Sequence, residues 1–162
     1  MSDHTVRLIV NGAAVEATVP ARLTLADLLR ERLDVTSVHL GCEHGVCGAC
    51  TILLDGEPVR ACLQLAVQAE GAEISTLEGV VSLESPLHPV QQAFWEKHGL
   101  QCGFCTPGIV MSTIDLLERD SRPSRETIVE TLAGHVCRCT GYVKIVEAVE
   151  EASRVISEGI QA

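Results

Sequence analysis

Aromatic residues are scarce in this chain of 162 residues, where they make up 2% of the sequence against 46% for hydrophobic residues as a whole. The core must therefore be built from aliphatic side chains, and so apolar a short chain is expected to bury part of its surface against a partner. No run of about 18 apolar residues occurs, so no transmembrane helix is expected. The first residues show no signal peptide and no twin-arginine motif, which favours a cytoplasmic protein.

Basic residues are also few, with 12 Lys and Arg against 22 Asp and Glu and a net charge of −10. This balance argues against nucleic acid or an anionic membrane as a partner. The sequence contains no Ser–His–Asp pattern, no phosphate-binding glycine loop and no dinucleotide-binding fingerprint. No catalytic residues are therefore predicted in this chain.

Eight cysteines are present, and they fall into two sets of four with none left over. The first cysteine set has the spacing Cys-x4-Cys-x2-Cys on one glycine-rich loop, followed by a fourth cysteine: Cys42, Cys47, Cys50 and Cys62. This spacing is the plant-type ligand pattern of a 2Fe–2S cluster. Glycines between the ligands let backbone N–H groups approach the cluster sulfurs. A zinc site fits less well, because zinc usually takes two separated Cys-x2–4-Cys pairs.

The second cysteine set consists of a Cys-x2-Cys pair and a distant Cys-x-Cys pair: Cys102, Cys105, Cys137 and Cys139. By spacing alone this set is compatible with a second iron–sulfur cluster, with zinc, or with a redox-active dithiol at the first pair. Each pair ends in Cys-Thr just before a predicted helix, so Thr106 and Thr140 are expected as helix N-caps. Helix starts carry partial positive charge, which would stabilise a thiolate-bound cluster of charge about −2.

Residues 1–78 predict an α+β domain. Asn11-Gly12 joins two β-rich runs and indicates a tight hairpin. A short amphipathic helix is predicted over 23–33, with Thr24 as its N-cap. The predicted strands are 6–10, 15–19, 51–54, 58–62 and 74–76, which together would form a mixed sheet.

The hydrophobic period then changes from two to 3.6 residues. Residues 79–87 are predicted to be a linker, and 88–162 a compact helical domain. Its four predicted helices are 89–98, 107–118, 125–133 and 142–157.

Three motifs in this order resemble the signatures of a known family. They are Gly-Cys-Glu-His-Gly-Val-Cys-Gly-Ala-Cys-Thr at 41–51, Gln-Cys-Gly-Phe-Cys-Thr-Pro-Gly at 101–108, and Cys-Arg-Cys-Thr-Gly-Tyr at 137–142. The chain resembles the small iron–sulfur subunit of molybdenum hydroxylases, the xanthine dehydrogenase and aerobic carbon monoxide dehydrogenase family. The resemblance covers nearly the whole chain.

The resemblance implies a ferredoxin-like β-grasp domain followed by a four-helix domain, each holding one 2Fe–2S cluster. It further implies that the second cysteine set lies next to a molybdopterin-type molybdenum cofactor in a large partner subunit, with Gln101 and Cys139 contacting the pterin. The first set would then pass electrons to FAD in a medium subunit or to another acceptor. One motif departs from the family, which commonly has Gly-Asn-Leu where this chain has Gly134-His135-Val136.

The leading prediction is an electron-transfer subunit of a molybdenum-dependent oxidoreductase that carries no catalytic residues of its own. Two alternatives remain open at this point: a free-standing 2Fe–2S electron carrier, and a structural protein held together by zinc.

Overall fold

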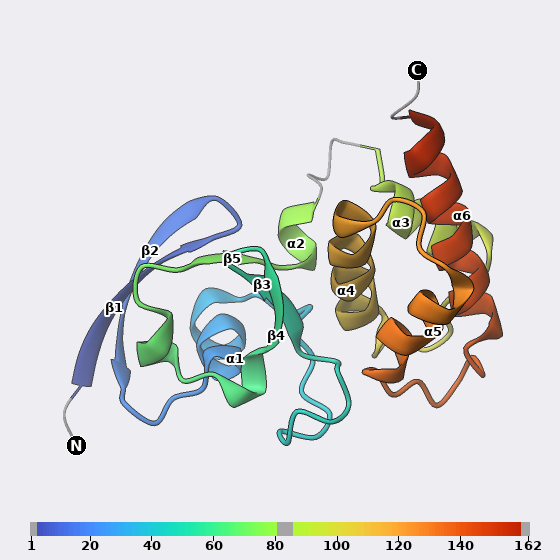
Figure 1. Cartoon of the computed structure of the whole chain (residues 1–162). Coiled ribbons are helices and arrows are strands. Elements are labelled where there is room, and N and C mark those ends of the chain that lie inside the picture. Colours follow the sequence, from blue (N-terminus) through green and yellow to red (C-terminus); the bar gives the residue numbers. More distant parts are fainter. Residues whose placement is uncertain (1–2, 81–85, 160–162) are drawn as a thin grey trace.

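The computed structural model describes residues 3–80 and 86–159. A sheet-containing lobe formed by the first half of the chain lies beside a lobe of helices formed by the second half (Figure 1). The core is accordingly in two parts, one built around the sheet and one between the helices.

The sheet begins with a hairpin of β1 (Asp3–Val10) and β2 (Ala13–Pro20). Its two-residue turn, Asn11 and Gly12, has φ values of 51° and 79°. Both are left-handed, as a type I′ turn requires, so the predicted hairpin is confirmed. The remaining strands are β3 (Thr51–Leu54), β4 (Glu57–Arg60) and β5 (Glu73–Ser75).

The strand order is β2-β1-β5-β3-β4. β1 and β5 pair in parallel, whereas the other neighbouring strands pair antiparallel. The expectation of a mixed sheet is therefore confirmed.

The predicted helix also packs within this lobe, where Thr24 caps it by accepting a hydrogen bond of 3.1 Å from the N–H of Asp27. Only its first part, α1 (Leu25–Asp27), is α-helical, because the chain widens into a π-helix, η1 (Leu28–Arg32).

The predicted strand 58–62 is wrong at its end. β4 stops at Arg60, and a 3₁₀ turn, η2 (Ala61–Leu63), follows. The N–H of Ala61 bonds the carbonyl of Cys50, and the turn then directs Cys62 toward the cysteine loop. A second 3₁₀ turn that the sequence pattern did not predict, η3 (Ala66–Ala69), leads to β5.

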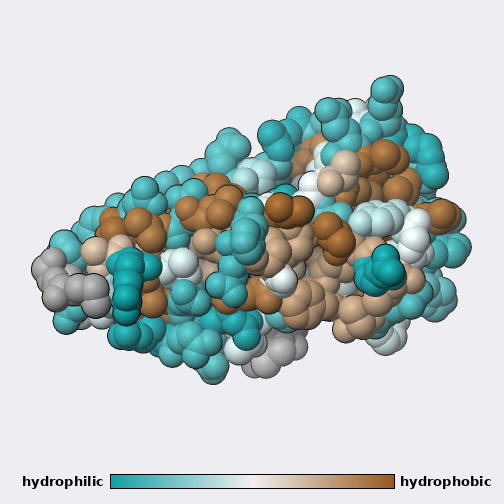
Figure 2. Space-filling view, turned by 90° about the horizontal axis from the view of Figure 1, so that it is seen from below, coloured by the Kyte–Doolittle hydropathy of each residue, from teal (hydrophilic) through white to brown (hydrophobic). Residues whose placement is uncertain are grey.

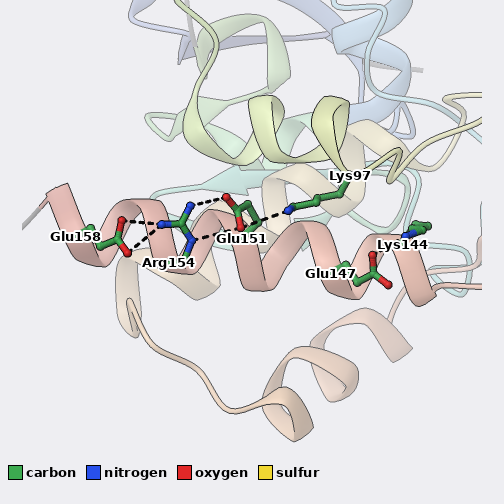
Figure 3. A network of polar contacts seen from close by, with 6 residues as sticks. All are labelled: Lys97, Lys144, Glu147, Glu151, Arg154 and Glu158. Atoms are coloured by element: carbon green, nitrogen blue, oxygen red, sulfur yellow. Dashed lines mark hydrogen bonds and ion pairs between the residues drawn. The ribbon is translucent and has the colours of Figure 1, made fainter.

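The helical lobe contains the four predicted helices at slightly different bounds: α3 (Pro89–Glu96), α4 (Thr106–Arg119), α5 (Arg125–Ala133) and α6 (Val143–Gly159). Its aliphatic core also includes Phe94, of which 1% is exposed. Within the described residues, no helix is long and apolar enough to cross a membrane. The outer face of α6 carries ion pairs, among which Glu151 binds both Arg154 and Lys97 (Figure 3).

Two expected N-caps are wrong. Cys105 is the N-cap residue of α4, so Thr106 is already the first helical residue. Thr140 lies before α6, and its hydroxyl accepts from the N–H of Tyr142 over 3.2 Å in a turn. Thr106 is therefore inside α4, which Cys105 caps, and Thr140 belongs to the turn that precedes α6 at Val143.

A short helix, α2 (Leu77–Val80), follows the sheet. Leu77 and Val80 pack against the core of the helical lobe, although they directly follow the last strand in sequence. The predicted linker 79–87 thus begins inside α2, and its residues 81–85 lie outside the described part of the chain. The domain boundaries remain a prediction.

Candidate metal centres

The loop of the first cysteine set points backbone N–H groups at a sulfur. Cys42 Sγ accepts from the N–H of Cys47 at 3.4 Å and from that of His44 at 3.3 Å. Hydrogen bonds from these two N–H groups, that of Cys47 foremost, lower the pKa of Cys42 to about 6. Donors aimed at a thiolate are the arrangement that tunes iron–sulfur clusters.

The other end of the first set is buried. Cys50 and Cys62 are 2% and 8% exposed. Burial raises the pKa of Cys50 to about 11. A buried thiol with so high a pKa becomes an anionic ligand only when a bound metal compensates its charge.

Glycines give this loop its close packing. Gly45 and Gly48 have φ values of 77° and 76°, which side chains rarely adopt. A Cβ at Gly41 would lie 3.1 Å from Cys47 Sγ. The backbone can therefore lie directly beside the sulfurs.

The second cysteine set is brought together from two loops that are far apart in sequence. Cys102 Sγ and Cys139 Sγ are 3.4 Å apart and exposed, whereas Cys105 and Cys137 are buried. Burial raises the pKa of Cys105 to about 12. All four thiols are free, so the set forms no disulfide.

Tyr142 holds the second of these loops in place. Its hydroxyl accepts from the N–H of Cys137 over 2.7 Å and donates to the carbonyl of His135 over 2.9 Å. Thr140 Oγ1 lies 3.1 Å from Cys137 Sγ. Tyr142 is the last residue of the third sequence motif, but the sequence did not predict that its hydroxyl would bond to the backbone of this loop.

These residues fit 2Fe–2S clusters. In a cluster of this kind each iron takes two of the four thiolates, so no single ion needs to gather three of them. Within the described part of the chain, no three His, Cys, Asp or Glu side chains are grouped around a single metal position. The free thiols, the N–H donors and the glycine backbone are the features that a cluster requires.

The two cysteine sets meet where the lobes join. The N–H of Val136 donates to the carbonyl of Cys47 over 2.9 Å. The ring of Phe104, between two cysteines of the second set, lies close to Gly41, beside the first set. His39 stacks on this ring with centroids 4.7 Å apart. Spacing predicted the two sets but gave no signal for this contact between them.

His135, which departs from the family motif, is 2% exposed. Its Nε2 lies 2.8 Å from the hydroxyl of Ser112 on α4, and its ring packs against Gly48. Burial, together with the charge of Arg60, lowers the pKa of His135 to about 4. The His135 side chain is therefore neutral at pH 7 and lies in the interface between the two lobes.

The cysteine loops expose apolar side chains among polar ones. Figure 2 views the molecule from below and shows hydrophobic side chains spread over both lobes. Each cysteine loop contributes an exposed apolar residue: 68% of Val46, 47% of Phe104 and 54% of Val136 are exposed. Gln101 is exposed beside Cys102.

Two family models cover the chain in sequence. Residues 8–76 match the "2Fe-2S iron-sulfur cluster binding domain" and residues 76–150 the "[2Fe-2S] binding domain". The chain is 53% identical over 156 residues to caffeine dehydrogenase subunit gamma of Pseudomonas sp. (strain CBB1), covering 94% of this chain and 93% of the relative. It is also 53% identical over 143 residues to the nicotine 6-hydroxylase small subunit of Paenarthrobacter nicotinovorans, covering 88% and 86%.

The chain belongs to the small iron–sulfur subunits of the molybdenum hydroxylase family. It is an electron-transfer subunit of a multi-subunit oxidoreductase, with two 2Fe–2S-binding regions. These findings favour the leading prediction over the free-standing carrier and the zinc protein.

Solved structures confirm the fold. The structure of quinoline 2-oxidoreductase from Pseudomonas putida 86 matches with a TM-score of 0.91 at 42% identity, over 97% of this chain and 98% of that chain. Aldehyde oxidoreductase from Desulfovibrio desulfuricans ATCC 27774 matches equally, at 0.91 and 43% identity, over 96% of this chain but 17% of that chain. The predicted ferredoxin-like domain followed by a helical domain is therefore the family fold.

Proposed function

We propose that this subunit carries electrons from a molybdenum cofactor in a large partner subunit to FAD in a medium partner subunit or to another acceptor. Electrons would enter at the second cysteine set and leave from the first. Each set would hold one 2Fe–2S cluster, with Cys42, Cys47, Cys50 and Cys62 as ligands of one, and Cys102, Cys105, Cys137 and Cys139 as ligands of the other. Catalysis of the substrate reaction belongs to the large partner.

The observation that carries this proposal is the direct contact between the two cysteine loops. The N–H···O bond from Val136 to Cys47 joins a ligand of the first set to the residue before Cys137. The rate of electron transfer falls steeply with distance, so transfer from one cluster to the other requires that the two loops lie close together. A structural zinc site would have no need of it.

Exposure supports the direction of transfer. Cys102 and Cys139 lie at the surface with Gln101, so a partner's cofactor could approach them directly. We assign Gln101 and Cys139 to the contact with the pterin on this basis and on the family motif. The exposed apolar side chains of Val46, Phe104 and Val136 on these loops support burial against the partners.

Two further assignments concern the cellular compartment and the domain boundaries. We propose a cytoplasmic complex, because eight free cysteines suit a reducing compartment. We also propose that residues 1–78 and 88–162 are the two domains, connected by 79–87.

The first test is the cluster content of the purified complex. The reduced protein should contain about four iron atoms per copy of this chain and give two distinct spin-1/2 EPR signals. Half the iron with one signal would contradict the assignment of the second set. Zinc without acid-labile sulfide would contradict both assignments.

The second test concerns the order of the two sets. Cys47→Ser should slow electron exit to the acceptor while leaving the molybdenum cofactor bound, whereas Cys139→Ser should disturb the molybdenum signal. The measurements are the molybdenum EPR spectrum and the rate of acceptor reduction. Equal effects of the two substitutions on both readouts would contradict the order.

A further inference from the structure

We propose that Arg60 is a positioning residue that ties the two cysteine loops together and places a positive charge between the two clusters. This inference rests on the proposed function, because it requires a cluster at each set. Arg60 is the last residue of β4 and belongs to none of the sequence motifs.

The guanidinium group of Arg60 bonds to both sides of the joint. Its Nη2 donates to the carbonyl of Gly134 over 2.7 Å, three residues before Cys137. Its Nη1 donates to Thr51 Oγ1 over 2.6 Å. That hydroxyl in turn donates to the carbonyl of Gly48 over 2.6 Å, between two ligands of the first set.

This chain of bonds runs parallel to the backbone contact between Val136 and Cys47. Both connect the segment 134–136 to the loop of the first set. A planar guanidinium with donors in fixed directions can hold two acceptors at once, which a lysine ammonium on its flexible stem does less well. Arg60 therefore fixes how the two loops approach each other.

Arg60 forms no ion pair within the described part of the chain. Among the described residues, no carboxylate lies within the 4.0 Å of an ion pair with Arg60. Asp115 lines the same cavity of about 420 Å³, but it pairs with Arg119. Taking an unpaired cation partly out of water is unfavourable unless negative charge lies nearby.

Two clusters would supply that negative charge. An oxidised 2Fe–2S cluster with four thiolates carries about −2, and reduction makes it more negative. A nearby cation favours the more negative form, because the attraction between opposite charges increases. Arg60 is therefore expected to raise the reduction potential of the adjacent clusters.

Three variants of the intact complex separate the effect of the Arg60 hydrogen bonds from the effect of its positive charge. Arg60→Lys keeps the positive charge but loses the planar fork, whereas Arg60→Gln loses the charge. Arg122→Gln is the matched control, because Arg122 is an exposed arginine on the loop between α4 and α5. The readouts are EPR-monitored redox titration of both clusters and hydrogen exchange of the Val136 N–H.

Arg60→Gln should lower the potential of at least one cluster by about 59 mV relative to the control, which is a tenfold change in the ratio of reduced to oxidised cluster. Arg60→Lys should leave the potentials near those of the wild type. In Arg60→Gln and Arg60→Lys the Val136 N–H should exchange about tenfold faster, since one of the two connections between the cysteine loops is lost.

Potentials in Arg60→Gln that equal those of Arg122→Gln would overturn the proposal. An unchanged exchange rate at Val136 in Arg60→Lys would overturn it as well, and this variant keeps the test decisive if Arg60→Gln does not fold. The proposed function is tested separately by the wild-type protein, whose four irons and two EPR signals do not depend on Arg60.

Discussion

The N–H of Val136 donates to the carbonyl of Cys47 across 2.9 Å, so the chain entering the second cysteine set is bonded to a residue of the first. Gly108 of α4 also lies directly against the carbonyl of Gly48, where a Cβ would collide with it. The two cysteine loops are therefore parts of one joint. A change in one loop should be detected at the other.

Gly48→Ala tests this joint. A Cβ at Gly48 would lie 2.7 Å from the carbonyl of Gly134 and would overlap the ring of His135. The clash should cost about 1–3 kcal/mol of unfolding free energy, beyond the roughly 1–2 kcal/mol of a left-handed alanine. We also expect iron to be lost from both sites, as measured by iron content and by EPR.

Gly12→Ala is the matched control for Gly48→Ala. Gly12 has a similar φ of 79°, but no heavy atom lies within 4 Å of a Cβ placed there. It should show the conformational cost alone and keep both clusters. Equal iron loss in the two variants would contradict the idea of a joint.

Removal of the clusters should expose thiols of very different reactivity. At pH 7 Cys42, whose pKa is about 6, is mostly thiolate in the cluster-free protein. Cys50 and Cys105 have pKa values of about 11 and 12 and stay protonated. Iodoacetamide should therefore label Cys42 well before the other two, because the thiolate is the nucleophile.

Mass spectrometry of peptides from briefly alkylated protein measures this order. The cluster-loaded protein is the control, in which the ligand thiols should be protected. Uniform labelling of the three cysteines at pH 7 would contradict the hydrogen-bond arrangement around Cys42.

Much of this molecule could be predicted from local sequence. The Asn11-Gly12 hairpin, the cap at Thr24 and the four later helices follow from turn chemistry and periodicity, which act over a few residues. The cysteine spacing predicted the two ligand sets for the same reason. The residues that determine these features lie within them or directly beside them in the sequence.

The rest depends on contacts between distant segments. Arg60 reaches Gly134 across 74 positions, and no local pattern marks either residue. The 3₁₀ turn at Cys62 is equally non-local, because Ala61 bonds the carbonyl of Cys50. Thr106 and Thr140 had the right residue type for a cap, but the geometry of the cysteine loops moved the helix starts.

Arg154 on the outer face of α6 should contribute little to stability. It binds Glu151 and Glu158 at 2.6 and 2.7 Å, but 53% of its side chain is exposed (Figure 3). Water screens such pairs, so Arg154→Gln should change the unfolding free energy only slightly, and less still at high salt. Ile145→Ala, on the buried face of the same helix, should cost about 2–5 kcal/mol. Urea denaturation compares the two variants, and a larger cost for Arg154→Gln would contradict this ranking.

His88 should make stability depend on pH. Its Nδ1 accepts from the N–H of Val90 over 3.2 Å at the start of α3, which only a neutral ring can do. Burial lowers the pKa of His88, against a weaker opposite effect of Glu118. The unfolded chain then binds the proton more readily, so this contribution to stability is complete above a pH of about 6.5 and is lost as pH falls toward the folded-state pKa.

His88→Asn keeps a side-chain acceptor at the N-cap but does not titrate. It should match the wild type at pH 7.5 and lose less unfolding free energy between pH 7 and pH 5, as followed by thermal or urea denaturation. His98→Asn is the control, because His98 is exposed and its φ of 56° suits asparagine. The control should keep the wild-type slope. If the slope of His88→Asn also equals that of the wild type, the neutral histidine cap does not set the acid sensitivity of this lobe.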